Sequence, residues 1–206
     1  MLVITAFLTC DGQNPFIRHM YTADPSAHVF EGSVYVYPSH DRDSSVTFDM
    51  VDYHVFSSEN LVDWTDHGVV LSLDEVSWAS ENAWAPDCGF YNGKYYLSYS
   101  TWGERGVTGP QIVYATSDHV LGPYEYQGVI LDEVNSGTNH HSIVEYKGDW
   151  YLFYHNSDLF LEKTPEDSPD MKYRPFRRSI CVDRLYYNED GSIRKVIPTK
   201  KGVAID

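Results

Sequence analysis

Apolar and polar residues alternate along the chain in short runs, and these runs recur. Three segments superimpose when they are aligned on a glycine, HVFEGSVYVYPSH, CGFYNGKYYLSYST and SIVEYKGDWYLFYHN, with Gly32, Gly93 and Gly148 in register. Each segment has two runs of aromatic and β-branched residues around a tight turn, which predicts a β-hairpin. No stretch of useful length has the period of an amphipathic helix.

A second unit follows the first two hairpins, YHVFSSENLVDWTDHGVVL and QIVYATSDHVLGPYEYQGVIL. Without any gap, Ser57 aligns with Ser117 and Gly68 aligns with Gly128. The third hairpin is followed by RRSICVDRLYYNEDGSI, in which NEDG predicts a turn between two strands. Each repeat therefore predicts about four strands, which is the size of a β-propeller blade.

We predict a single all-β domain over residues 1–206, a β-propeller shortened to about three visible four-stranded blades, with repeats at roughly 19–75, 82–132 and 136–206. A meander or sandwich of similar hairpins is the alternative. Propellers usually have about four to eight blades, and three blades leave open sheet edges. Two copies that close a six-bladed ring would cover these edges, so we expect a homo-oligomer.

The net charge of -15 repels phosphate backbones and anionic membrane surfaces. We therefore expect neither nucleic acid nor a membrane as a partner. The seventeen Tyr and five Trp provide flat faces that suit sheet packing and also the stacking of sugars. This composition agrees with a small saccharide as the ligand.

Three cysteines, Cys10, Cys88 and Cys181, are far apart and odd in number, so we predict small buried residues and no disulfide framework. The opening MLVITAFLTC is apolar and ends in Cys, which is a feature of a lipoprotein signal. It lacks a basic n-region, and Thr9 occupies the position that normally carries a small residue. We expect a cytoplasmic protein, with a periplasmic or secreted location as the alternative.

The innermost strand of each propeller blade starts near the central axis, so side chains at these starts converge. Asp24, Ala85 and His140 lie eight residues before the aligned glycines. Asp87 follows Ala85 by two residues, so the strand period directs it to the same side. We predict a pocket lined by Asp24, Asp87 and either His140 or His141. A turn at Asp24 and a structural histidine are the alternatives, and calcium would need waters to complete its coordination.

Two further positions could contact a sugar. Arg177 and Arg178 begin a strand and face opposite ways, so one guanidinium could bind hydroxyls or a carboxylate in the pocket. The alternative is a surface pair beside residues 162–170, an acidic segment with prolines that predicts a mobile loop. Trp84 could stack on a sugar face or belong to the core.

These segments, together with WAPDC, resemble the glycoside hydrolases of family 43, which are five-bladed propellers that include β-xylosidases and α-L-arabinofuranosidases. The resemblance covers nearly the whole chain in the family's order. It implies hydrolysis, with inversion, of terminal β-D-xylosyl or α-L-arabinofuranosyl residues of hemicellulose-derived saccharides. It further implies that Asp24 is the general base, that His141 holds water or Ca²⁺ in the central cavity, and that Arg178 contacts the substrate. From their positions in the sequence, His140 and Trp84 are further substrate-binding candidates.

The chain departs from the family at one junction. The family's third blade and the Glu-bearing start of its fourth blade have no counterpart, so about two of five blades are missing near residues 88–92. Inversion needs two carboxyl groups about 6.5–9.5 Å apart. Asp87 is the best substitute for the missing acid, while Glu81 and Glu104 lie in predicted loops. The alternative is a catalytically impaired remnant that binds sugars or self-assembles.

Overall fold

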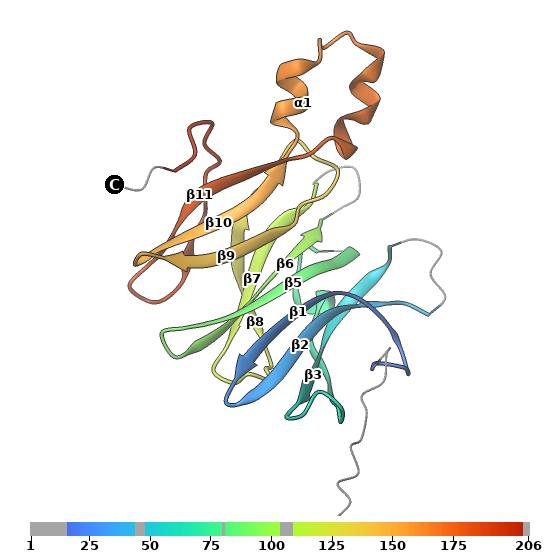
Figure 1. The fold of residues 1–206 in the computed structure, drawn as a ribbon, viewed down its shortest axis with the longest axis vertical. Helices are drawn as coiled ribbons and strands as arrows, with labels where there is room; N and C mark the ends of the chain where they lie inside the picture. Colours follow the sequence, from blue (N-terminus) through green and yellow to red (C-terminus); the bar gives the residue numbers. More distant parts are fainter. Residues whose placement is uncertain (1–15, 44–47, 80, 104–108, 204–206) are drawn as a thin grey trace, which may run out of the picture.

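The computed structural model describes residues 16–43, 48–79, 81–103 and 109–203, which form three four-stranded antiparallel sheets (Figure 1). The first sheet contains β1 (Tyr21–Phe30), β2 (Ser33–Asp41), β3 (Met50–Ser58) and β4 (Thr65–Ser72). The second contains β5 (Glu81–Tyr91), β6 (Lys94–Trp102), β7 (Gln111–Ser117) and β8 (Glu125–Leu131). The third contains β9 (His141–Tyr146), β10 (Asp149–Asn156), β11 (Ser179–Tyr187) and β12 (Ile193–Arg194). The predicted all-β fold, a shortened propeller with three blades of four strands, is confirmed.

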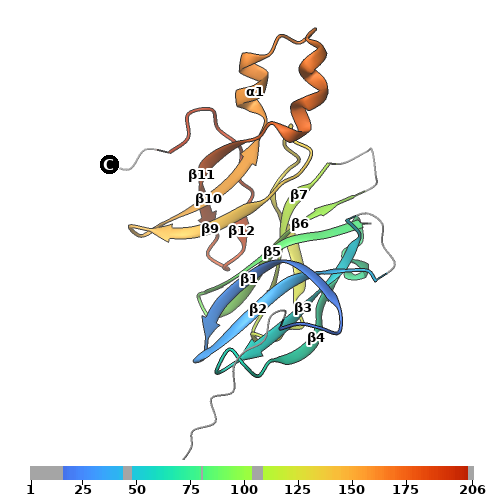
Figure 2. The ribbon, with the colours of Figure 1, turned by 45° about the vertical axis from the view of Figure 1, so that its right-hand side comes forward.

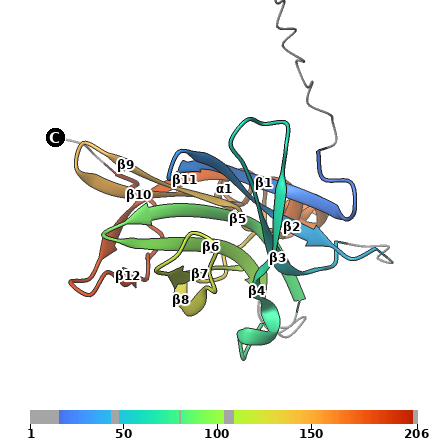
Figure 3. The same cartoon turned by 90° about the horizontal axis from the view of Figure 1, so that it is seen from below.

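The three sheets follow one another, and the first strands of each are the ones that meet. In sequence and in space β5 lies between β1 and β9 and contacts both strands (Figures 1 and 2). From below, β5 and β6 lie between the third sheet and the first (Figure 3). The middle sheet therefore has a neighbour on each side.

Two apolar cores fill the spaces between the sheets. The first core joins the first and second sheets and includes Tyr37, Tyr53 and Leu97, each fully buried. The second core joins the second and third sheets around Ile112 and Leu152. Because each core is shared by two sheets, burial of these side chains stabilises the packing between blades as well as the blades themselves.

The three aligned glycines occupy the same position in the same kind of turn. Gly32, Gly93 and Gly148 have φ angles of 86°, 81° and 83°. The residue before each glycine also has a positive φ: Glu31, Asn92 and Lys147. Two consecutive positive φ angles define a type I′ turn, which matches the twist of the flanking strands, and glycine adopts this conformation at least cost.

Matching bulges interrupt the innermost strands of the first two sheets. Asp24 and Ala85, which the repeat alignment pairs, have positive φ angles of 49° and 39°. Each precedes a proline, and each lies where the strand shifts register against its neighbour, between Ala23 and Ser26 in β1 and between Trp84 and Asp87 in β5. A bulge re-aims the side chains beside it, so the simple strand period does not hold here.

Two local predictions were wrong. The segment 162–170, predicted to be a loop, lies between and partly within helical turns, α1 (Asp158–Lys163) and the 3₁₀ helix η2 (Pro169–Phe176), and a further 3₁₀ turn, η1, spans Leu73–Glu75. Ser168 caps η2 by accepting a hydrogen bond from the Asp170 amide. Cys88 is buried as expected, but Cys181 is partly exposed, and Cys10 lies outside the described residues. Over the described ranges, every helix is too short or too polar to cross a bilayer.

Candidate functional site

A polar cluster forms where β1 and β5 meet. The Oδ1 atom of Asp87 lies 2.9 Å from Nε2 of His28 and accepts a hydrogen bond of 2.9 Å from the Ser26 hydroxyl. Ser26 and His28 are two residues apart on β1 and follow its bulge, so both side chains face β5. The bulge in β5 places Asp87 opposite them. The serine and carboxylate share one imidazole nitrogen, so this is not the proton-relay arrangement of a nucleophilic serine.

The carboxyl group of Asp87 favours its ionised form. Burial opposes ionisation, but the hydrogen bond from His28, the nearby imidazole of His141 and the hydroxyl of Ser26 together lower its pKa below the usual value. Asp87 is therefore a carboxylate at neutral pH. It can accept hydrogen bonds from sugar hydroxyls, but it has no proton to give to a leaving group.

His141 brings the third sheet to this cluster. It is the first residue of β9, and its Nε2 lies 2.7 Å from the hydroxyl of Ser98 on β6. The Ser98 hydroxyl in turn donates to the backbone carbonyl of Asp87 at 3.3 Å. Burial lowers the pKa of His141 to about 4, so the imidazole is neutral at physiological pH.

A cavity of about 210 Å³ adjoins this cluster, and His28, Asp87, Ser98 and the aromatic ring of Trp150 are among the residues that line it. It is smaller than the pockets of about 300–1,000 Å³ that hold drug-sized ligands. Its size therefore suits one small sugar residue. The mixture of an aromatic face and a carboxylate is the combination that sugar recognition needs.

Asp24 lies in a different environment. Its Oδ2 accepts a hydrogen bond of 3.1 Å from the hydroxyl of Ser39 on β2, and its charge acts on the buried Tyr53 of β3. The hydroxyl of Tyr53 donates to the backbone carbonyl of Trp84 at 3.0 Å, which ties β3 to β5. Asp24 is thus held by the second strand of its own sheet, and it is only partly buried.

The two adjacent histidines have different surroundings, and only His141 belongs to β9. His140 is exposed, and its ring stacks with that of His155 at a centroid distance of 6.2 Å. The guanidinium of Arg178 donates to the Thr138 hydroxyl at 3.1 Å, and Arg178 and His140 both line an open cavity of about 400 Å³. His140 and Arg178 therefore lie near each other on the wall of this open cavity.

Trp84 lies apart from both cavities that contain predicted residues. Its ring makes edge contacts with Trp102, at 6.2 Å between centroids, and with Phe48, at 6.5 Å. It lines neither the cavity beside Asp87 nor the cavity beside Arg178. Its contacts favour the alternative that Trp84 is a packing residue.

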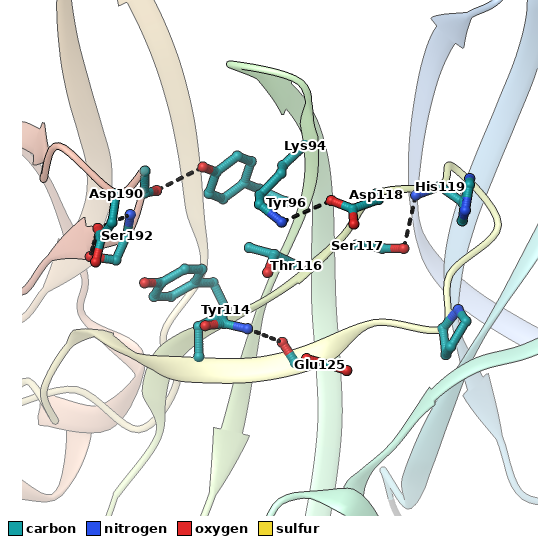
Figure 4. Close-up of a pocket in the computed structure, with 13 residues that line it drawn as sticks. Lys94, Tyr96, Tyr114, Thr116, Ser117, Asp118, His119, Glu125, Asp190 and Ser192 are labelled. Atoms are coloured by element: carbon teal, nitrogen blue, oxygen red, sulfur yellow. Dashed lines mark hydrogen bonds and ion pairs between the residues drawn. The ribbon is translucent and has the colours of Figure 1, made fainter.

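A further cavity of about 330 Å³ lies between the second sheet and the turn that joins β11 to β12 (Figure 4). Lys94 pairs with Asp118 at 2.8 Å on one wall, and the Tyr96 hydroxyl donates to the Gly191 carbonyl at 2.7 Å on the other. Both contacts are structural, and none of the predicted site residues lines this cavity.

Known proteins are similar to this chain in sequence. The sequence profile named Glycosyl hydrolases family 43 matches residues 12–137. Xylosidase/arabinosidase 43A of Humicola insolens is 46% identical over 120 residues, which are 53% of this chain and 36% of that protein. The chain belongs to glycosyl hydrolase family 43.

Other members of family 43 are similar over different lengths. A β-xylosidase of Xylanibacter ruminicola is 44% identical over 129 residues, 63% of this chain and 34% of that protein, so this chain spans about a third of two curated relatives. A xylosidase/arabinosidase of Bacteroides ovatus is 25% identical over 323 positions, 84% of this chain and 94% of that protein. Because this chain has only 206 residues, that relative contains a long internal segment without a counterpart here.

One solved structure supports the fold. The endo-arabinase of Bacteroides thetaiotaomicron VPI-5482 superimposes with a TM-score of 0.54 at 19% identity, and the match covers 79% of this chain and 50% of that one. At this identity the similarity concerns the fold alone. It agrees with blades that are retained in shape while part of the ring is missing.

An inverting glycosidase uses two carboxyl groups that lie about 6.5–9.5 Å apart, so the two need not touch each other. Across the described residues, no hydrogen bond or ion pair joins Asp24 to Asp87, and the two share no bonding partner. The pKa of Asp87 is lowered, whereas a general acid benefits from a raised pKa, so the role of Asp87 as the general acid stays a prediction. Of the other carboxyl groups considered, Glu104 and the side chain of Glu81 lie outside the described residues.

The calcium site expected in family 43 has one matching residue. His141 presents a buried Nδ1 that makes no hydrogen bond within the described chain. Calcium binds six to eight oxygen atoms, whereas His141 offers one nitrogen, so the surrounding side chains do not fit this ion without water oxygens.

Two residues of the cluster, Ser26 and His28, were not predicted from the sequence. A signal for them exists, since both alternate with Asp24 along β1 and would share its face in a regular strand. His155, which contacts His140 and Thr138, was also missed. It lies at the end of β10, a position that the repeat alignment does not associate with the pocket.

Proposed function

We propose that this chain acts on terminal β-D-xylosyl or α-L-arabinofuranosyl residues of hemicellulose-derived saccharides as a glycoside hydrolase of low activity. The observation that carries the proposal is the cavity where the first strands of the sheets meet, lined by His28, Asp87 and Trp150. Family membership supports the reaction class, and the names of the similar xylosidases and arabinosidases support the choice of pentosides.

Asp24 is the proposed general base. Its carboxylate is partly accessible, and its Oδ2 accepts a hydrogen bond from the Ser39 hydroxyl. Asp24 does not line the cavity beside Asp87, so a saccharide bound there has to extend toward the bulge of β1 to reach it. Asp87 has the complementary task of binding, because an ionised carboxylate accepts hydrogen bonds from hydroxyl groups. Departure of the leaving group then depends on a proton from solvent, which makes hydrolysis slow.

A second function is sugar binding without cleavage, and the lowered pKa of Asp87 favours it. A protonated carboxyl group is what an inverting glycosidase uses to release the leaving oxygen. With Asp87 ionised, the cavity retains recognition and loses this step. In that case the ancestral reaction is absent while pentose affinity persists.

We also propose that copies of the chain self-associate through the third sheet. Its outer face carries Val144, Phe153 and Ile180, which are 42%, 40% and 83% exposed. Apolar side chains grouped on one exposed face are typical of an interaction surface. A second copy would cover them.

Release of 4-nitrophenol from its β-D-xyloside and α-L-arabinofuranoside tests the enzyme reading. We expect measurable turnover in the parent and a loss of about a hundred- to ten-thousand-fold in Asp24→Asn. Asp118→Asn, an exposed carboxylate outside the candidate site, is the matched control and should retain full activity.

Calorimetric titration with xylose and arabinose separates the two functions. An inactive parent that binds a pentose, with binding lost in Asp87→Asn, would establish sugar recognition without hydrolysis. A parent that neither cleaves the aryl glycosides nor binds either pentose would contradict both proposals.

A further inference from the structure

A second group of polar side chains lies on the first sheet, away from the cavity described above. His40 on β2 and Asp52 and His54 on β3 each offer one potential metal-ligand atom, and these atoms lie within 4.8 Å of one another. The Nδ1 atom of His40 is 2.8 Å from Oδ1 of Asp52, and the rings of His40 and His54 meet edge to face at 5.2 Å. Two imidazoles and one carboxylate thus share one spot.

The strand pattern places this group on the outer face of the sheet. Ser39 and Tyr53 are paired neighbours on β2 and β3, and both point inward, where Ser39 binds Asp24. Adjacent residues on a strand face opposite sides, so His40, which follows Ser39, and Asp52 and His54, which flank Tyr53, lie on the other face. The group is therefore separate from the candidate catalytic face.

A set of surrounding contacts orients His54. Its Nδ1 lies 3.1 Å from Oδ1 of Asp66 on β4, and the other carboxylate oxygen of Asp66 is 2.8 Å from Nε2 of His19. The ring of Phe56 stacks against His54 at 6.1 Å with an interplanar angle of 18°. A carboxylate on the second nitrogen of a histidine fixes its tautomer and ring orientation, as is usual around metal-binding histidines. Because Nδ1 faces Asp66, Nε2 is the nitrogen left for a ligand.

We propose that His40, Asp52 and His54 bind a zinc ion on the outer face of the first sheet. Imidazole nitrogen and carboxylate oxygen at about 2.0–2.2 Å are ordinary zinc ligands, and three protein ligands with a fourth, water-filled position form a known type of zinc site. Ligand atoms around a tetrahedral zinc are about 3.3 Å apart, so His40 and Asp52 have to separate by about half an ångström, and the ligand atom of His54 has to approach them by at most about 1.5 Å. The ion ties β2 to β3.

The protons of both histidines are accounted for. The Nδ1–H group of His54 donates a hydrogen bond to Asp66, and His54 binds the zinc ion through Nε2. When no metal is bound, the Nδ1–H group of His40 donates a hydrogen bond to Asp52. When zinc binds at Nδ1, His40 adopts the tautomer that carries its proton on Nε2. Partial exposure of the His40 and Asp52 side chains, at 23% and 18%, gives the ion a path from solvent.

The first measurement is a calorimetric titration of the parent chain with zinc chloride after removal of metals by a chelator. We expect one zinc per chain and a rise in Tm of about 5–10 °C at free zinc a hundred times the Kd. Calcium and magnesium, which prefer oxygen ligands, should cause no such rise. Absence of a one-to-one zinc complex in the parent overturns the proposal.

Variants then assign the site. Asp52→Asn preserves the shape of the side chain and can still hydrogen-bond to His40, so its fold is retained, and His40→Gln removes one nitrogen ligand; both should abolish one-to-one binding. Asp66→Asn alters the contact that orients His54, together with the contacts of Asp66 to His19 and the Gly68 amide, and should weaken binding about ten- to a hundred-fold. His67→Ala is the control, since this exposed histidine of β4 contacts only the Ser57 hydroxyl among the contacts described for it. Zinc affinity that is equal in the parent, Asp52→Asn and His40→Gln would assign the uptake to other histidines and overturn the proposal.

Discussion

The second and third sheets are equally apolar in sequence but differ in how much of that surface is covered. On β6 every residue between the terminal ones is buried, because alternate side chains enter different cores: Tyr96 joins the core shared with the third sheet, and Leu97 joins the core shared with the first. On β9, by contrast, four of the six residues are exposed, Val144 among them. The middle sheet has two neighbours, and the third sheet has one.

This difference indicates that another blade would cover the outer face of the third sheet in a complete ring. The third sheet packs its inner face, with Leu152 fully buried, against the second sheet. Its outer face keeps Phe153 and Ile180, residues of the kind that a neighbouring blade would cover. The third sheet therefore has apolar residues on both faces, and only its inner face is covered by an adjacent blade.

The largest expected effect concerns core residues of the middle sheet. Leu97→Ala should lower the free energy of unfolding by about 2–5 kcal/mol, because the cavity lies between two packed sheets and cannot easily collapse. Val144→Ala on the outer face of the third sheet should cost less than about 1 kcal/mol. Urea unfolding of both variants measures the contrast.

Leu152→Ala is the internal control for this comparison. It lies in the third sheet but faces the covered side, so it should resemble Leu97→Ala. If Val144→Ala proved as costly as Leu152→Ala, the outer face of the third sheet would have to be packed in solution.

The second prediction concerns the contact between the second and third sheets, which contains a titratable group. His141 has a pKa of about 4 in the folded chain and 6.5 as its ordinary value, because burial disfavours the charged imidazole. The unfolded chain therefore takes up the proton first as pH falls. Above pH 6.5 His141 is neutral in both states, and the free energy of unfolding does not depend on its protonation. Between pH 6.5 and about 4 the free energy of unfolding falls by about 3 kcal/mol in total.

Urea unfolding as a function of pH tests this prediction. His141→Gln should flatten the dependence in this range, because glutamine can still bind the Ser98 hydroxyl and does not titrate. The carboxyl group of Asp87, whose pKa is lowered, stays ionised over this range and loses its own contribution only below its ordinary pKa of 3.8. An unchanged pH dependence in His141→Gln would contradict the assignment.

Local patterns in the sequence were sufficient to predict the sheets. The positive φ angles at Gly32, Gly93 and Gly148 are properties of single positions, so alignment on these glycines finds the hairpins. The four-strand repeat was predicted from the recurring segments, whereas the two equivalent bulges at Asp24 and Ala85 were not predicted. The short helices were missed because their few turns show no measurable periodicity.

The site was harder to predict, because it depends on what the bulges do. A strand period of two assigns Asp24 and Asp87 to one pocket, but the register shift in each strand turns Asp24 toward Ser39 and Asp87 toward His28. The charge state of Asp87 depends on partners from another blade, which sequence spacing does not reveal. Contacts between distant segments thus decide the chemistry, whereas local periods decide the strands.

The smallest expected effect concerns the uncovered face of the third sheet. Ile180 lies on the same face as Phe153 and Val144, because His155 pairs with Ile180, Phe153 with Val182 and Ser142 with Phe153.

If a second copy covers this face, the parent should sediment as a dimer at high concentration. Ile180→Glu should weaken that association about ten- to a hundred-fold, the value of one buried aliphatic side chain, with little change in Tm. Ile197→Glu, which is 68% exposed but lies outside the sheet, should associate like the parent. A parent that is monomeric at every concentration, or an equal loss in both variants, would mean that the third sheet tolerates an uncovered apolar face, and the contrast with the middle sheet would then be one of packing alone.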